Sequence, residues 1–317
     1  MVEFLSYTVI GIVFGSVYAI AAAGLVVTYT TTGIFNFAHG AVGMVMAFAY
    51  WQLSDDMGWP GWLALIVVLV LLAPMLGVVL ERVLFRRLSD ASVGVTLVVT
   101  VGLLVMLLGL AQTLWPGTEQ RVLTEFFVGN SITLFDIVIS YHQLVTFFAA
   151  LAVAFGLRVL LFQTRVGVAM RAVVDNPELA AQNGAVPERV ARLAWVVGTM
   201  LAALAGILLA PDLSLAHVGL TLLVINGYAA AMLGRLRNLP LTFAGAMVLG
   251  LLQSYIIGYG GRWRFGAGWL GNSHLLAELQ PVLPVLMLFV ILVFMPQARL
   301  RAGRVVGAST PRVPGLR

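Results

Sequence analysis

The sequence predicts an all-α fold, a polytopic bundle of about eight to ten transmembrane helices. Three observations predict it: 61% of the 317 residues are hydrophobic, the mean hydropathy is +1.02, and long apolar runs recur at nearly even spacing. Soluble domains contain far fewer apolar residues, and a helix needs about 20 of them to cross a bilayer. We therefore expect one transmembrane domain over residues 1–298, followed by a basic cytoplasmic tail over residues 299–317.

The individual crossings follow from the apolar runs. The first run is too long for a signal-peptide core and is not preceded by a basic segment, so we expect it to be retained as a helix. Polar residues interrupt the second run at Asn36 and His39 and the seventh at Asn226. The predicted crossings are 4–28, 33–53, 61–83, 92–114, 141–161, 190–211, 217–234, 240–259 and 279–296.

Small residues recur at four-residue spacing within two of these crossings. Such residues let helix backbones approach closely in lipid, where packing replaces the hydrophobic driving force between helices. The pattern predicts close helix contacts at Gly11 and Gly15 and at Gly198, Ala202 and Gly206.

The arginines predict the orientation in the membrane. The sequence has no lysine, so all 18 basic residues are arginines. If the N-terminus is outside, only Arg121, Arg262 and Arg264 fall on outer segments, and all other arginines fall on inner ones. Positive charge accumulates on the cytoplasmic side of membrane proteins. We therefore expect a multi-pass protein of the bacterial inner membrane with the N-terminus outside and the C-terminus cytoplasmic.

Composition also argues against several functions. Without lysine the chain has no phosphate-binding loop of its own, and without cysteine it has no disulfide or thiolate chemistry. The four histidines are scattered without metal-ligand spacing, and the arginines form no nucleic-acid-binding stripe. We expect no enzymatic activity, no cofactor, no metal and no nucleic-acid partner. We expect membrane lipid to surround the helices.

Polar residues inside the predicted crossings are neutral. No acidic residue lies near the middle of a crossing, which disfavours an ion-driven carrier. In "TTGIFNFAHGAVGM", glycines weaken the helix while Asn36 and His39 share a face. One interpretation is a broken helix beside a solute path; the alternative is a helix start at which Asn36 caps and His39 bonds a neighbouring carbonyl. The candidate pathway residues are Tyr18, Asn36, His39, Gly40, Asn226 and Tyr228.

A weaker echo of this segment appears at "VINGYAAAMLG", residues 224–234. It crosses in the opposite sense in the predicted topology. An inverted repeat around a central path would produce such a pair, and chance similarity in a chain rich in glycine and alanine is the alternative.

The longest inner connection, residues 162–190, has the start and stop signals of a short helix outside the membrane. Asp175 or Asn176 can cap it, Pro177 fits the first helical position, and Glu178 favours the positive end. Gly184 fits the left-handed stop and should have a positive φ. Because so short a helix is marginal in water, either the bundle or another protein should hold it.

Four blocks of sequence carry a resemblance to a known family: "GSVYAIAAAGLVVTYTTTGIFNFAHG", "ERVLFRRL", "RVGVAMRAVVDNPELAAQNGAVPERV" and "GAMVLGL". The chain resembles the membrane permease of branched-chain amino acid ABC transporters over nearly its whole length. The resemblance implies an importer built from two permeases, two ATP-binding subunits and an external solute-binding protein. It also implies that the inner helix docks on the ATPase through Asp175, Asn176, Pro177, Glu178, Leu179, Ala180, Ala181 and Gly184.

One stretch departs from the family. Members carry a glycine-rich "LGGxGSxxGA" pattern after the seventh crossing, whereas this chain reads "LGRLRNLPLTFAGA", with Arg235, Arg237 and Pro240 in place of small residues. Leucine specificity therefore does not follow from the resemblance, and related small solutes remain candidates. We expect the second permease to be a paralogue. The alternative function is a self-sufficient secondary carrier or channel for a small polar solute.

Overall fold

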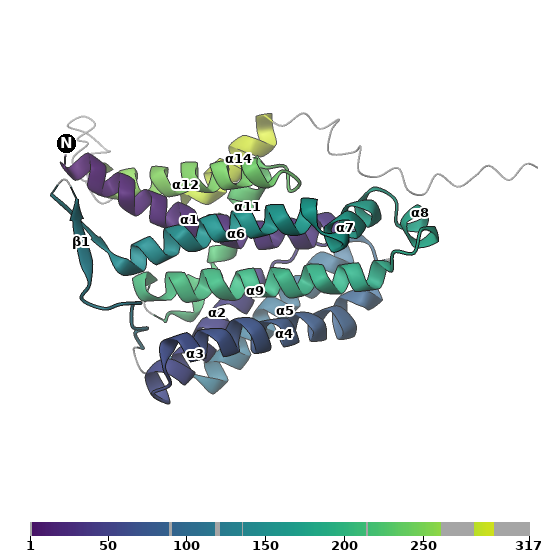
Figure 1. Cartoon of the computed structure of the whole chain (residues 1–317), viewed down its shortest axis with the longest axis horizontal. Coiled ribbons are helices and arrows are strands. Elements are labelled where there is room, and N and C mark those ends of the chain that lie inside the picture. The colour runs from purple at the N-terminus through teal and green to yellow at the C-terminus, as the bar shows by residue number, and fades with distance from the viewer. Residues whose placement is uncertain are drawn as a thin grey trace, which may run out of the picture.

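The computed structural model describes residues 2–88, 91–117, 121–134, 136–213, 215–260 and 282–294. Over these ranges long helices run side by side, and their connections gather at the two ends of the bundle (Figure 1). The N-terminus and a small β-hairpin lie at one end, and helix α8 protrudes at the other (Figure 1). The predicted tail at 299–317, together with Arg262 and Arg264, lies outside the described residues.

Within the described ranges, six helices are long and apolar enough to cross a membrane, and shorter apolar helices lie at His217–Leu233 and Leu283–Phe294. This confirms a polytopic helical bundle; the number of eight to ten crossings stays a prediction. The six are α1 (Val2–Thr32), the continuous helix Gly61–Leu88, α5 (Val93–Leu114), α6 (Tyr141–Gln163), α9 (Pro187–Leu213) and α12 (Leu239–Gly260).

The helix Gly61–Leu88 changes its winding along its length. It consists of α3 (Gly61–Ile66), π-helical η2 (Val67–Leu72), α4 (Ala73–Val79), π-helical η3 (Leu80–Leu84) and the 3-10 turn η4 (Phe85–Leu88). Shorter elements complete the fold. They are α2 (His39–Trp51), π-helical η1 (Gln52–Asp56), α7 (Arg165–Asp175), α8 (Pro177–Gln182), α10 (His217–Thr221), α11 (Leu223–Leu233) and α14 (Leu283–Phe294).

Helices α1 and α9 form the centre of the bundle and bury most of their residues, whereas α5 and α6 expose bulky apolar side chains. Helix α1 packs antiparallel on α12, since a Cβ added at Gly11 would lie 2.8 Å from the Cα of Leu251 and one at Gly15 would lie 3.0 Å from the Cα of Met247. The carbonyl of Gly43 on α2 would meet a Cβ added at Gly206 on α9. The close contacts predicted from the small residues are therefore confirmed.

The predicted crossing at 33–53 begins too early, because the chain between α1 and α2 is not helical from Gly33 to Ala38. Helix α1 continues to Thr32, Gly33 ends it with φ +70°, and the next helix begins only at His39. A positive φ is accessible to glycine without steric penalty, which explains why the helix stops there. The seventh crossing is also interrupted, because Leu222 separates α10 from α11.

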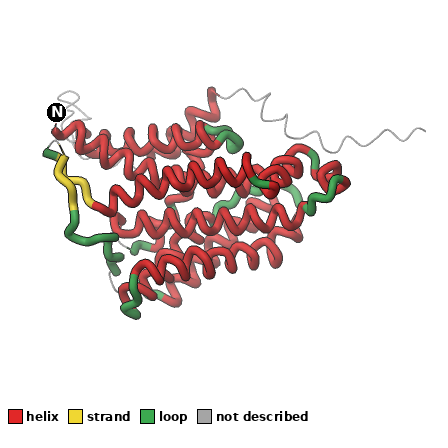
Figure 2. The backbone as a smooth tube through the Cα atoms, viewed as in Figure 1, coloured by secondary structure: helices red, strands yellow, loops and turns green. Residues whose placement is uncertain are grey.

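A small hairpin that was not predicted accompanies the mostly helical fold. Strand β1 (Ser131–Leu134) pairs antiparallel with β2 (Ile137–Ser140), with Ser131 opposite Ser140. The stretch is rich in Ile, Val and Thr, which favour strands, and Asp136 has a positive φ of 63° at the turn. The hairpin (yellow in Figure 2) lies at the end of the bundle that holds the N-terminus.

Candidate solute pathway and docking helix

The break between α1 and α2 buries two polar side chains. Asn36 and His39 are each 2% exposed. The N-cap residue of α2 is Ala38, and no side chain caps the helix there. The alternative that Asn36 caps this helix is therefore wrong. The side-chain oxygen Oδ1 of Asn36 and the ring nitrogen Nε2 of His39 are buried without a hydrogen bond of normal geometry, although the His39 ring lies next to the backbone of Ala21 on α1.

The His39 ring lies against the backbone of α1. A Cβ added at Gly24 would lie 2.7 Å from Cε1 of His39, so only glycine leaves room for the imidazole. The next residue, Gly40, faces the carbonyl of Thr221, which a Cβ at position 40 would overlap. Gly40, a predicted pathway residue, thus lets the start of α2 contact the end of α10, while His39 packs on α1.

Aromatic rings surround the same break. The ring centroid of Tyr228 on α11 lies 5.2 Å from that of Phe37 and 6.3 Å from that of Phe35. Phe35 also packs on Tyr29 near the end of α1, at 4.6 Å. The buried hydroxyl of Tyr228 lies next to the backbone of Asn36 without forming a hydrogen bond of normal geometry, and the buried Oδ1 of Asn36 has no partner either. The break therefore combines aromatic walls with unpaired polar atoms.

The other predicted pathway residues form a separate hydrogen-bonded chain. The Tyr18 hydroxyl donates to Oε1 of Gln253 at 2.6 Å, and Nε2 of Gln253 donates to Oδ1 of Asn226 at 2.9 Å. These bonds join α1, α12 and α11. Asn226 and Tyr228 are two residues apart, and two residues turn an α-helix by about 200°, so they leave α11 on nearly opposite sides. The candidate pathway residues therefore fall into two groups in the structure.

Gln253 was not among the predicted pathway residues, although its side chain is hydrogen-bonded to both Tyr18 and Asn226. Its signal in the sequence was a lone amide inside the eighth apolar run. Neutral hydroxyl, amide and imidazole groups next to aromatic rings can bind the polar part of a small solute and pack against its apolar part. Among the described residues, no cluster of three or more His, Cys, Asp or Glu side chains could hold a metal ion.

Helix α8 has the start and the stop that the sequence predicts. The side-chain oxygen of Asn176 accepts hydrogen bonds from the backbone of Glu178 and Leu179 at 3.1 and 3.0 Å. Gly184 has φ +88°, which confirms the predicted left-handed stop. The amides of Gly184 and Ala185 donate to the carbonyls of Ala181 and Ala180, both at 3.0 Å, in a Schellman motif. Hydrogen bonds thus hold both ends of a six-residue helix.

Two corrections concern the surroundings of α8. Asp175 was predicted to belong to the docking helix, but it is the last residue of the preceding helix α7. Helix α7 itself was not predicted. It places Gly167, Met170 and Val173 on a buried face and so anchors the base of α8 to the bundle. Helix α8 contacts α7 and α9 and leaves Glu178 and Leu179 exposed, Leu179 to 55%.

Comparison with known proteins identifies the family. Residues 7–295 match the family described as branched-chain amino acid transport system / permease component. The permease protein BraD of the high-affinity branched-chain amino acid transport system of Pseudomonas aeruginosa is 27% identical over 93% of this chain and 94% of its own. LivH of Escherichia coli K12 is 27% identical over 90% and 92%. A probable LivH of Methanocaldococcus jannaschii is 28% identical over 82% of each chain. The chain belongs to this permease family, whose members are transporter components and not enzymes.

Proposed function

We propose that this member of the branched-chain amino acid permease family is the transmembrane subunit of an ABC importer for branched-chain amino acids or a closely related small solute. Separate ATP-binding subunits drive it. The observation that carries the proposal is α8, a short exposed helix with both ends held by hydrogen bonds, protruding from one end of the bundle. A stiff exposed helix has the form needed to receive force from a partner protein.

The solute in this proposal passes beside the break between α1 and α2. Asn36 and Tyr228 offer unpaired polar atoms there, and Phe35 and Phe37 offer apolar surface. A branched-chain amino acid has both a polar end and an apolar side chain, which matches this combination. The names of the relatives agree with it.

The proposed topology has nine crossings, counting α2, the α10–α11 pair and α14 with the six long helices. The N-terminus lies outside, and α8 lies on the cytoplasmic side. Support comes from the arginines, because Arg86, Arg171 and Arg192 lie in or beside the segments that meet next to α8. An external solute-binding protein would then meet the end with the N-terminus and the hairpin, and a paralogous second permease completes the complex.

An inverted repeat completes the proposal. The order α1, α2, Gly61–Leu88, α5 in the first part corresponds to α9, α10–α11, α12, α14 in the second. Helix α1 pairs antiparallel with α12, the third member of the second part. Correspondingly, α9 pairs antiparallel with α4 of the first part, since Thr199 contacts Ala73 and Arg192 contacts Glu81. An approximate two-fold axis between α1 and α9 would produce this exchange of partners.

The docking role of α8 is tested by Gly184→Val. A β-branched residue resists φ +88°, so the substitution should disturb the end of α8 and weaken binding of the ATP-binding subunit. Gly58→Val is the matched control, because Gly58 also has a positive φ (+71°) and open space around it. At matched expression, Gly184→Val should lose ATPase pull-down and leucine uptake, and Gly58→Val should keep both. Normal binding and uptake by Gly184→Val would refute the docking role.

The alternative function is a self-sufficient secondary carrier or channel. In that case α8 is only a solvated surface helix, and its disturbance should change stability by little. Leucine uptake into vesicles that contain this chain without an ATP-binding subunit or ATP would favour the alternative. Copurification with an ATP-binding subunit and strict ATP dependence would exclude it.

A further inference from the structure

A buried carboxylate lies close to the docking helix. The buried polar side chains of the described residues include one carboxylate, Glu81, and its side chain is 3% exposed. It lies in the π-helical stretch η3, and wide turns of this kind occur frequently at functional sites. A buried carboxylate is tolerated only when charged or polar partners compensate it. Glu81 has two such partners.

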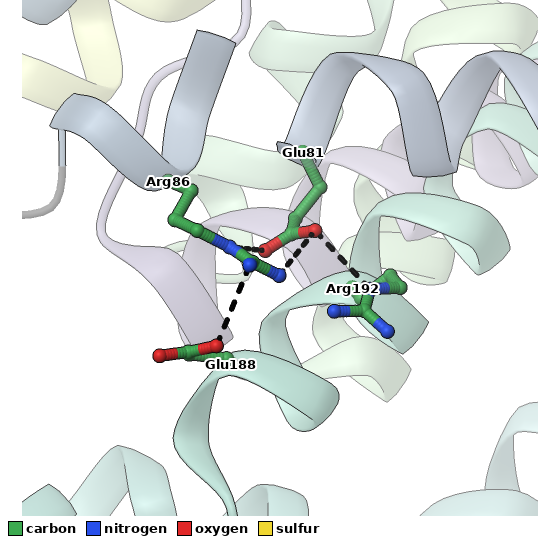
Figure 3. A network of polar contacts seen from close by, with 4 residues as sticks. All are labelled: Glu81, Arg86, Glu188 and Arg192. Atoms are coloured by element: carbon green, nitrogen blue, oxygen red, sulfur yellow. Dashed lines mark hydrogen bonds and ion pairs between the residues drawn. The ribbon is translucent and has the colours of Figure 1, made fainter. Parts of the chain in front are cut away.

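Both partners are arginines, and they come from different segments. Nε and Nη2 of Arg86, in η4, donate to the two carboxylate oxygens of Glu81 at 3.1 and 3.3 Å. Nε of Arg192, in α9, donates to Oε2 of Glu81 at 3.2 Å. Figure 3 shows both guanidinium groups converging on the carboxylate. Glu81 thus joins the end of the helix Gly61–Leu88 to the beginning of α9.

Arg86 also has a second acceptor. Its Nη1 lies 3.5 Å from Oε2 of Glu188, in the first turn of α9 (Figure 3). The side chain of Glu188 is 63% exposed, so this contact is weaker than the buried one. Arg86 therefore bridges a buried carboxylate and an exposed one. A small shift of α9 would change how closely Arg86 contacts each of them.

The position of Glu188 connects this network to α8. Only two residues, Ala185 and Val186, lie between Gly184 at the end of α8 and Pro187 at the start of α9. Helix α8 contacts α7 and α9. Displacement of α8 by a partner would act through this two-residue link on the first two turns of α9, where the network holds Glu188 and Arg192.

Beyond the network, α9 is packed firmly on the helix Gly61–Leu88. The rings of Phe85 and Trp195 stack at 3.9 Å, and the Thr199 hydroxyl donates to the Ala73 carbonyl at 2.8 Å. The same part of α9 faces α1, since a Cβ added at Gly24 would lie 3.1 Å from Cβ of Leu201. Gly24 is the residue against which His39 packs. A continuous set of contacts thus runs from α8 to the break between α1 and α2.

We propose that Glu81, Arg86, Glu188 and Arg192 form a coupling joint, and that Glu81 is the positioning residue that makes movement of α8 reach the solute pathway. The inference rests on the proposed function and assigns a role to the "ERVLFRRL" segment. The joint works because a charged carboxylate holds two arginines from two helices at once. When α8 moves, Arg86 shifts between Glu81 and Glu188, and α9 moves against η3 without leaving a buried charge unpaired.

The test is Glu81→Gln in the complete complex, reconstituted with its ATP-binding subunits, second permease and external binding protein. Glutamine keeps the size of the side chain and removes the charge. Leucine uptake per ATP hydrolysed should fall about tenfold, within the usual range of coupling between sites, while ATPase pull-down stays normal. Glu81→Asp should restore part of the ratio. A role in folding alone would lower the yield and leave uptake per ATP unchanged.

A matched pair on α9 provides the control. Arg192→Gln removes one partner of Glu81, and Arg189→Gln removes an exposed arginine one turn earlier that lies outside the joint. Only Arg192→Gln should lower uptake per ATP. If Glu81→Gln does not accumulate, this pair decides the question. If uptake per ATP stays at the wild-type value in Glu81→Gln, in a complex that still couples ATP to uptake, the joint is overturned. If Glu81→Gln does not accumulate, the same result in Arg192→Gln overturns it. ATP-independent uptake by the wild type would instead overturn the proposed function and the joint with it.

Discussion

The coupling joint and the break between α1 and α2 are both buried polar regions, but their hydrogen bonding differs. In the joint, three donor groups from two arginines reach both oxygens of Glu81. At the break, Oδ1 of Asn36 and the hydroxyl of Tyr228 have no partner. Buried polar groups in folded proteins are nearly always paired, and each unpaired one costs about 1 to 3 kcal/mol.

We infer from this difference that the joint holds helices together and that the break is available to a ligand. Paired charges from two helices fix the geometry of those helices. Unpaired polar atoms destabilise the free protein, and a solute that supplies their hydrogen bonds recovers that free energy on binding. Stability and transport should therefore respond in opposite ways to substitutions in the two regions.

The largest effect should follow from removing the arginines of the joint. The double substitution Arg86→Met and Arg192→Met leaves the carboxylate of Glu81 buried and unpaired, which should destabilise the protein by about 3 kcal/mol or more. Glu81→Gln removes the charge instead and leaves two arginines, 35% and 31% exposed, that can reach water. Glu81→Gln should therefore lower the free energy of unfolding by much less than the double substitution does. Thermal unfolding in detergent measures the stability of both variants. If the double substitution and Glu81→Gln lower it equally, the proposed role of the arginines in compensating Glu81 is contradicted.

At the break, transport should respond more strongly than stability. Asn36→Ala should reduce leucine uptake about tenfold, because a bond to the solute is lost, and His39→Ala should reduce it as well. Asn36→Ala should leave the unfolding temperature nearly unchanged, since its Oδ1 has no partner to lose. Asn238→Ala is the control. Asn238 accepts a bond from the amide of Leu241 at 3.1 Å, so its loss should lower stability and spare uptake. Normal uptake in both Asn36→Ala and His39→Ala would remove these residues from the pathway.

Features that depend on neighbouring residues were predictable from the sequence. Asn176 before Pro177, and Gly184 seven residues after it, predict the limits of α8 because capping and left-handed turns are local. Glycines at four-residue spacing likewise predicted a close helix contact at Gly11 and Gly15, because helical periodicity brings them to one face, but they did not predict that α12 is the partner. The assignment of Asp175 to this helix failed, since either of two adjacent residues could cap it, and the preceding helix α7 was not predicted.

Features that depend on distant residues were not predictable. Glu81 pairs with Arg192 across 111 residues, and Tyr18 pairs with Gln253 across 235. Nothing in a local pattern tells which polar residues meet in the bundle. The division of the pathway residues into a bonded and an unbonded group is a tertiary property for the same reason. The hairpin at 131–140 is a local feature whose Ile, Val and Thr residues favour strands, but the prediction relied on apolar runs long enough for helices and left this loop unassigned.

The smallest effect should come from two tyrosines that differ in a single bond. Tyr18 and Tyr228 are buried to similar degrees, at 5% and 6% exposure. The Tyr18 hydroxyl donates to Gln253 at 2.6 Å, whereas the Tyr228 hydroxyl is unpaired.

Removal of each hydroxyl should therefore change the free energy of unfolding with opposite sign. Tyr18→Phe leaves Oε1 of Gln253 without its donor and should destabilise the protein by about 1 kcal/mol. Tyr228→Phe removes a buried group that had no partner, so it should stabilise the protein by up to about 1 kcal/mol and lower leucine uptake. Unfolding temperatures of the two variants in the same detergent, compared with the wild type, give the sign directly. If Tyr228→Phe is as destabilising as Tyr18→Phe, the Tyr228 hydroxyl has a partner in the folded protein, and the break is no more open to a ligand than the bonded chain is.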